Sequence, residues 1–169
     1  MVADNRRKNI LEKLFKAEAP FKGSYLAEIF GVTRQVIVKD IAILRAEGNK
    51  IIATPDGYII EKEDRNKIKK IIAVNHKECD MIKELEIVIK YGGTIEDVII
   101  EHPVYGEIVG KLMIKSINDL NKFDEKYKKY AGKPLSILTN GIHLHTISVD
   151  SEENMNYIKK ELKDAGFIL

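Results

Sequence analysis

The 169-residue sequence has little cysteine, little net charge and no long apolar run, and each of these shortages excludes some classes of protein. Its one cysteine, Cys79, excludes an internal disulfide and fits a reducing compartment, so we expect a cytoplasmic protein. No apolar run approaches the ~20 residues that span a bilayer, and residues 1–15 contain no uninterrupted apolar stretch. Neither a membrane partner nor a secretory signal is therefore expected. The net charge of +2 is too small to indicate a nucleic-acid partner by itself.

Common catalytic and nucleotide-binding motifs are missing as well. The sequence has no P-loop, no Gly-x-Gly-x-x-Gly turn and no Gly-x-Ser-x-Gly elbow. What it has is the composition of a globular protein, with 44% hydrophobic and 32% charged residues. Its length suits one sizeable domain or two small ones.

The first fifty residues predict three helices. Apolar residues recur at helical spacing in residues 4–16, and Ser24 is a good N-cap for a short helix that Gly31 ends. Thr33 can cap a third helix, "RQVIVKDIAILRAE", whose apolar positions fall on one face. Two β-rich runs around Pro55-Asp56-Gly57 then predict a hairpin. Three helices followed by a hairpin are typical of a winged helix-turn-helix.

The third predicted helix carries polar residues outside its apolar stripe, as a helix in the DNA major groove would. Arginine and glutamine in the first turn can bind guanine and adenine edges bidentately, whereas later basic residues suit phosphates. Small three-helix units also serve as protein-interaction modules, and a charged face is usually only solvated. The candidate DNA-binding residues are Thr33, Arg34, Gln35, Lys39, Arg45 and Lys50.

A charged run at residues 61–70 predicts a domain boundary near residue 64. It separates a DNA-binding domain, residues 1–63, from a second domain, residues 64–169. The second domain alternates predicted strands and helices, including strands at "PLSIL", "IHLHTISV" and the final "FIL". The overall prediction is an α+β protein, in which an N-terminal winged helix-turn-helix precedes an α/β-layered effector domain with a mixed sheet and helices on one face.

Two histidines stand on one face of a predicted strand. His143 and His145 are two residues apart, and residues two apart in a strand point the same way. His76 ends the first strand of the domain, and Glu84 lies in the helix that follows. Three imidazoles and one carboxylate suit a divalent transition metal such as zinc, nickel, iron or manganese.

The spacing leaves alternatives open. The two histidines could simply form hydrogen bonds at a strand edge. Glu86 borders the same helix face as Glu84, and the Cys79 thiolate would also bind zinc well. A metal with an open coordination position would also fit a metal-dependent hydrolase or a metal-sensing regulator, and not only an effector site.

Several quoted motifs together resemble a known family. The helix-turn-helix and wing resemble those of small-molecule-responsive bacterial repressors. The second half resembles the three-histidine domain, with His76, then "EHPVYGEI", then "GIHLHTI" in that order. Together they resemble the NiaR-type, niacin-responsive repressors of NAD biosynthesis and niacin uptake. The resemblance implies a metal held by positions matching His76, Glu84, His143 and His145, with Glu84 preferred over Glu86 and Cys79.

The resemblance also implies a function and partners. Because one winged helix reads only a few base pairs, we expect a homodimer, joined mainly through residues 65–169, that binds double-stranded operator DNA. Nicotinic acid would be the co-repressor, and one divalent metal per chain, nickel or zinc, would form the floor of its pocket. His102 and Tyr105 are the predicted effector-binding residues. No catalytic residue and no enzymatic activity are expected.

Overall fold

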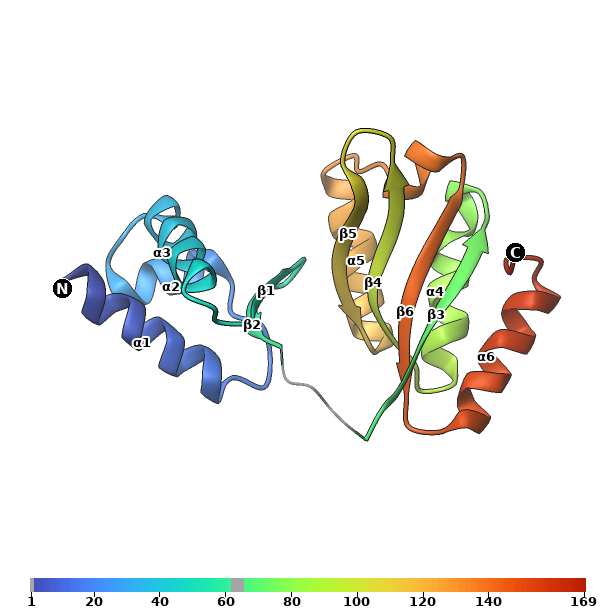
Figure 1. Ribbon diagram of the computed structural model, residues 1–169, viewed down its shortest axis with the longest axis horizontal. Coiled ribbons are helices and arrows are strands. Elements are labelled where there is room, and N and C mark those ends of the chain that lie inside the picture. The colour runs from blue at the N-terminus through green and yellow to red at the C-terminus, as the bar shows by residue number, and fades with distance from the viewer. Residues whose placement is uncertain (1, 62–65) are drawn as a thin grey trace. The chain divides into compact units, whose positions relative to one another are not determined.

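The protein, a computed structural model, is described over residues 2–61 and 66–169. It divides into two compact units, residues 1–63 and 64–169. The predicted boundary near residue 64 lies outside the described residues. Each unit has its own core, so the two are described separately (Figure 1).

The N-terminal unit consists of three helices and a two-stranded sheet. Its elements are α1 (Ala3–Lys16), α2 (Gly23–Phe30), α3 (Arg34–Ala46), β1 (Ile51–Thr54) and β2 (Gly57–Ile60). One apolar core joins all of them: Ile10, Leu14, Leu26, Ala27, Ile37, Ile41, Leu44, Ile51 and Ile60. This arrangement confirms the predicted winged helix-turn-helix.

Local interactions explain where these elements begin and end. Gly31 ends α2 in the left-handed conformation, with φ 61°, and the Thr33 hydroxyl accepts a hydrogen bond from the Val36 amide at the start of α3. The predicted cap at Ser24 is wrong, because α2 begins at Gly23 and Ser24 lies inside its first turn. At Gly57, with φ 133°, a Cβ would lie 2.2 Å from the Phe21 carbonyl oxygen, so only glycine fits there.

The C-terminal unit is a four-stranded sheet with three α-helices. Its elements are β3 (Ile68–Asn75), η1 (Glu78–Asp80), α4 (Met81–Lys90), β4 (Thr94–His102), β5 (Gly106–Ile114), α5 (Ile117–Lys129), η2 (Leu135–Thr139), β6 (Ile142–Val149) and α6 (Glu152–Asp164). The strand order is β3-β6-β4-β5. This alternation of strands and helices confirms the α+β class.

Three details of this unit differ from the prediction. The sheet is antiparallel at every described pairing and not mixed, because β6 inserts between β3 and β4 and separates two parallel strands. The predicted strand "PLSIL" is a 3-10 helix, η2, which Pro134 precedes. The final "FIL" contributes only a single bridge between Ile168 and Val74.

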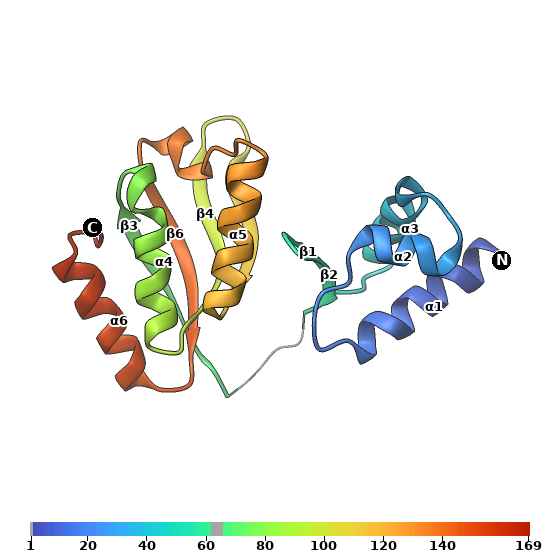
Figure 2. The same ribbon diagram turned by 180° about the vertical axis from the view of Figure 1, so that it is seen from behind.

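The helices pack on one face of the sheet, and this face holds the core. Figure 2 shows α4 and α5 in front of the sheet. Ile147 and Val149 of β6 point into this core with Ile158 of α6. Because alternate residues share a face, His143 and His145 also point toward the helices. The opposite face carries exposed apolar side chains, among them Ile71, Val109 and Ile142.

Within residues 2–61 and 66–169, no helix has the length and apolar character needed to cross a membrane.

Candidate metal centre and nucleic-acid interface

Four side chains that are far apart in the sequence meet beneath the helices. His76 follows β3, Glu84 lies in the first turn of α4, and His143 and His145 come from β6. The Nε2 atom of His76 lies 2.7 Å from Glu84 Oε2, that of His143 lies 3.5 Å from Oε2, and that of His145 lies 3.4 Å from Oε1. All four side chains are at most 4% exposed. The structure thus brings together all four predicted ligands.

The other ring nitrogen of each histidine contacts a backbone carbonyl oxygen. A carbonyl only accepts, so each Nδ1 carries a proton, and Nε2 is the ring nitrogen that faces Glu84. Such outer hydrogen bonds orient histidines for metal coordination. The pairs are His76 with Lys77 at 2.8 Å, His143 with Gly141 at 2.8 Å, and His145 with Asp97 at 2.6 Å.

The cluster has the electrostatics of a site for a cation. Burial by itself raises the pKa of Glu84, but the three histidines outweigh burial and hold this pKa well below its ordinary value. Burial likewise lowers the pKa of His76 and His145, but contact with Glu84 outweighs it and raises both. Imidazole nitrogens and a carboxylate that converge in a buried site need a positive charge between them. A proton or a metal ion can supply that charge.

The rival ligands point elsewhere. Glu84 is 1% exposed and adjoins the buried Leu85, whereas Glu86 is exposed on the outer side of α4. Cys79 is also exposed, and its thiol donates to the Asp80 carboxylate over 3.7 Å. Ligand atoms of His76, Glu84 and His143 lie within 4.8 Å of one another. Of Glu84, Glu86 and Cys79, Glu84 is therefore the one that is both buried and directed toward the histidines.

A glycine allows the chain to fold tightly beside the cluster. Gly141, with φ 96°, precedes β6, and a Cβ there would lie 2.6 Å from the His76 carbonyl oxygen. Its own carbonyl accepts from His143. Gly141 therefore permits the close approach of the two segments that carry these histidines.

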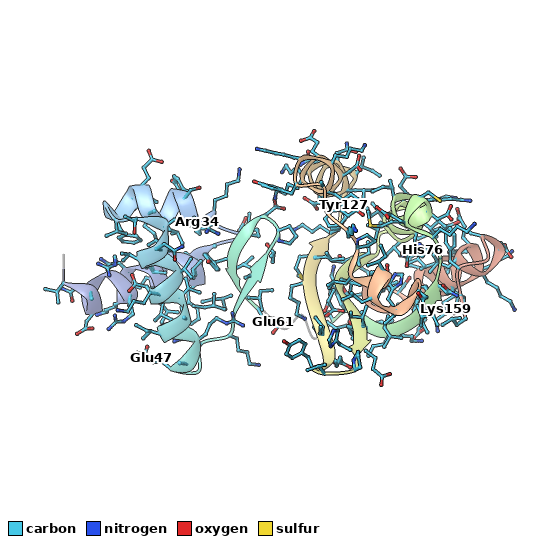
Figure 3. All side chains as sticks on the ribbon, turned by 90° about the horizontal axis from the view of Figure 1, so that it is seen from above. Arg34, Glu47, Glu61, His76, Tyr127 and Lys159 are labelled. Atoms are coloured by element: carbon cyan, nitrogen blue, oxygen red, sulfur yellow. The ribbon has the colours of Figure 1, made fainter. Side chains whose placement is uncertain are left out.

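A cavity of about 220 Å³ adjoins the cluster. Its remaining lining is mainly apolar, with a few polar groups from β5, α5, η2 and the segment between α5 and η2. The lining side chains outside the cluster include Met81, Leu85, Val98, Lys111, Leu112, Phe123, Tyr127, Lys133, Leu135 and Ser136. Figure 3 labels Tyr127 on α5 and His76 near α4. The Tyr127 hydroxyl donates to Glu78 over 2.6 Å, and this bond joins α5 to the segment that follows His76.

The two predicted effector-binding residues do not line this cavity. His102 and Tyr105 lie at the β4–β5 turn, where their rings stack at 5.0 Å, and Tyr105 is 75% exposed. The His102 Nδ1 atom accepts from the Val104 amide at 3.2 Å, so this histidine stabilises the turn. The structure therefore does not bring these two residues together with the cluster in this cavity, and their role in effector binding stays a prediction.

One buried residue near the cluster escaped the sequence analysis. Asp97 accepts from His145 through its backbone carbonyl, and its carboxylate accepts from the Thr146 amide at 3.1 Å and from Lys111 at 2.9 Å. It follows an irregularity in the pairing of β4 and β5. The signal was available in the run "TIEDVII", because two acidic residues inside a buried strand need partners.

The candidate DNA-binding residues lie on the exposed side of the N-terminal unit. Figure 3 labels Arg34 and Glu47 near opposite ends of α3. The six candidates are all exposed: Thr33, Arg34, Gln35, Lys39, Arg45 and Lys50. On the inner side of α3, Asp40 is buried and its Oδ2 lies 2.6 Å from Arg6 Nε of α1. This ion pair, which the periodicity did not reveal, holds α3 against α1.

The fold and the cluster together define a class of protein, a regulator with a helix-turn-helix unit and a separate unit that carries buried polar ligands beside a cavity. Comparison with known proteins supports this class. Residues 6–59 match an HTH domain, and residues 69–169 match the 3H domain. The chain is 42% identical over 168 residues to the probable transcription repressor NiaR of Thermotoga maritima, covering 99% of this chain and 95% of that protein. It is 33% identical over 172 residues to the transcription repressor NadR of Bacillus subtilis, covering 100% and 96%.

The chain therefore belongs to the NiaR-type family of transcription repressors, as the sequence motifs predicted. It is a DNA-binding regulator.

Proposed function

We propose that this repressor controls genes of NAD biosynthesis or niacin uptake, acts in the cytoplasm, and uses nicotinic acid as its co-repressor beside one divalent transition metal. The observation that carries the proposal is the convergence of three Nε2 atoms on the buried Glu84 carboxylate, next to a small apolar cavity. The convergence supports a metal, and the cavity supports a ligand of one ring.

The donor set fits nickel or zinc. Three neutral imidazoles and one carboxylate are ligands that both ions accept, and the backbone carbonyls already hold the three rings in the required tautomer. His76, Glu84, His143 and His145 would hold the ion. When bound, the metal would supply a Lewis-acidic position for a nitrogen or oxygen atom of the effector.

The cavity fits a small, flat, partly apolar molecule. Its volume of about 220 Å³ lies below the ~300–1,000 Å³ typical of sites for drug-sized ligands. Nicotinic acid has one aromatic ring, which suits the apolar walls, and a carboxylate and a ring nitrogen, which suit the polar groups. Binding would strengthen operator binding by the amount by which the effector prefers the DNA-binding state. A coupling of ~1–3 kcal/mol corresponds to an affinity change of about 5- to 150-fold.

We further propose a homodimer and a palindromic operator. One helix-turn-helix reads only a few base pairs, so specificity usually requires two of them on half-sites about one or more turns apart. The sheet face opposite the helices, with its exposed Ile71, Val109 and Ile142, supports an association through residues 65–169. Sedimentation of the full chain at micromolar concentration tests this, and a monomer would contradict it.

The decisive experiment measures operator affinity with and without nicotinate, using metal-loaded and chelated protein. The operator is first selected from random DNA by the purified chain. We expect nicotinate to strengthen binding only for the metal-loaded protein, and His143→Ala to abolish the response while retaining basal DNA binding. Equal nicotinate binding by metal-free protein would contradict the role of the metal. Chemical turnover of nicotinate by the loaded protein would favour a hydrolase-like activity instead.

A further inference from the structure

Two lysines line the cavity beside the cluster, and they differ in their partners. The Lys111 ammonium lies 2.9 Å from Asp97 Oδ2, so its charge is already matched. Lys133, which lies between α5 and η2, has neither a hydrogen bond nor an ion pair with any residue of the described ranges 2–61 and 66–169. Only one of the two lysines is thus available to a ligand without breaking an existing contact.

The burial of the lining residues indicates which end of the cavity is open. His143 and His145 are buried and mark the closed end. Lys133 is exposed, and Tyr127, another lining residue, is partly exposed, so these residues mark the end that solvent reaches. An entering ligand would therefore meet Lys133 at the mouth and apolar walls further in.

The charge of the cavity favours an anion. Glu84 is the one acidic side chain among the described lining residues, and it is already committed to three histidines. Asp97 matches the charge of Lys111, whereas Lys133 has no such partner among the described residues, and a divalent ion in the cluster would add two positive charges. An uncharged relative of the same ligand would gain nothing from this field.

We propose that Lys133 binds the carboxylate of the effector and so makes the site specific for an aromatic acid over the corresponding amide. This inference rests on the proposed function and deepens it. Lys133 would form a charge-assisted hydrogen bond at the mouth of the cavity, and the aromatic ring would lie against apolar side chains such as Leu135 and Phe123. The ring nitrogen would then lie at the end of the ligand that is further from the mouth.

Lys111 is the less suitable partner for the same carboxylate. Turning its ammonium toward a ligand would leave Asp97, whose side chain is 5% exposed, as a buried carboxylate that has lost its cation. Turning Lys133 toward a ligand costs only the freedom of one exposed side chain. The energetic difference assigns the ligand carboxylate to Lys133 and leaves Lys111 to stabilise Asp97.

The test measures ligand binding by titration calorimetry with the metal-loaded full chain and three variants. Lys133→Met removes the charge and retains most of the side-chain length, whereas Lys133→Arg keeps the charge. Lys129→Met is the matched control, because Lys129 is an exposed lysine of α5 whose ammonium lies over the Tyr130 ring, outside the cavity lining. Metal content is measured for every variant.

We expect Lys133→Met to weaken nicotinate binding about tenfold, which is the effect expected for one hydrogen bond to a charged group. Lys133→Arg and Lys129→Met should stay within about threefold of the unchanged chain, a difference below ~0.7 kcal/mol. Nicotinamide should bind more weakly than nicotinate to the unchanged chain and should not distinguish Lys133→Met from it. Metal content should be equal throughout.

Distinct results would overturn the inference and the proposed function. If Lys133→Met binds nicotinate as tightly as the unchanged chain does, the carboxylate contact is wrong while the proposed function stands. If Lys133→Met weakens nicotinate and nicotinamide equally, or loses metal, the lysine has a structural role and the inference fails. If the unchanged metal-loaded chain does not bind nicotinate, the proposed function fails and the inference fails with it.

Discussion

The two units place their functional polar groups in opposite environments. In the N-terminal unit the candidate DNA-binding side chains Arg34, Gln35 and Lys39 are exposed, and the core beneath them is apolar. In the C-terminal unit the candidate metal ligands, such as Glu84 and His145, are themselves part of the interior. A surface function can therefore change with little effect on folding, whereas a function built into a core changes stability as well.

The largest expected effect is a change in the stability of only one of the two units when the metal is removed. Loading with zinc or nickel should stabilise residues 66–169 alone, by ~4 kcal/mol when the free metal concentration is a thousandfold above the dissociation constant. For a domain of this size, that corresponds to an increase of more than ~10 °C in the melting temperature. Calorimetry of the full chain with and without chelator should show one transition that moves and one that does not. Two transitions that move together would contradict the division.

The next effect tests the buried Asp40 carboxylate of the N-terminal unit, which is paired with Arg6 and Arg7. Asp40→Ala should destabilise this unit by about 2–3 kcal/mol, because it leaves the Arg6 guanidinium, 11% exposed, without its partner. Asp40→Asn keeps the volume and an acceptor oxygen, so it should cost less. Urea unfolding measures both losses, and metal affinity should be unchanged in both variants. A loss below about 0.5 kcal/mol for the alanine variant would show that the pair is only superficial.

A smaller effect is expected for the residue that positions His145. Asp97→Ala keeps the backbone carbonyl that accepts from His145 but removes the carboxylate that holds this part of β4 to Thr146 and Lys111, so it should weaken metal binding about tenfold. Glu96→Ala is the matched control, since it also removes a largely buried carboxylate, paired with Lys69 at 2.9 Å. Glu96 has no contact with the cluster among the described residues. Equal losses in the two variants would attribute the effect to general destabilisation of β4.

The smallest effect on folding is expected on the exposed face of α3. Arg34→Ala should reduce operator affinity by ~1–2 kcal/mol per half-site and relax base preference, while the free energy of unfolding changes by less than about 0.5 kcal/mol. Lys39→Ala is the matched control, because loss of a phosphate contact should weaken all sequences alike and lower the salt dependence by about one counterion. Binding to operator variants at several salt concentrations distinguishes them. Intact base preference in Arg34→Ala would refute the assignment of α3 to the groove.

The sequence predicted those parts of the molecule that depend on short-range patterns. Apolar periodicity located α3, and the spacing of His143 and His145 placed both on one face of β6. Thr33 and Gly31 cap helices as expected, because capping depends on a few neighbouring residues. The family motifs correctly indicated a NiaR-type repressor.

Long-range pairing was not predictable in the same way. The insertion of β6 between β3 and β4, which makes the sheet antiparallel, leaves no local pattern in any of the three strands. "PLSIL" has the composition of a strand, but it forms a 3-10 turn between α5 and β6. The pairs formed by Asp40 with Arg6 and by Asp97 with His145 join residues more than thirty positions apart. His102 was expected near the pocket from the family resemblance, and the fold places it at the β4–β5 turn, outside the lining of the cavity.

The position of β6 has a consequence for the order in which the chain can acquire its properties. Residues 3–60 share one core and need no later part of the chain to complete it, so this unit can fold as soon as it has been synthesised. β3 and β4 are made early, but they become neighbours of a common strand only when residues 142–149 insert between them. The same step delivers His143 and His145 to Glu84. During synthesis, the DNA-binding unit is therefore complete before the four candidate ligands can meet, and closure of the long loop between β3 and β6 sets the pace of the second unit.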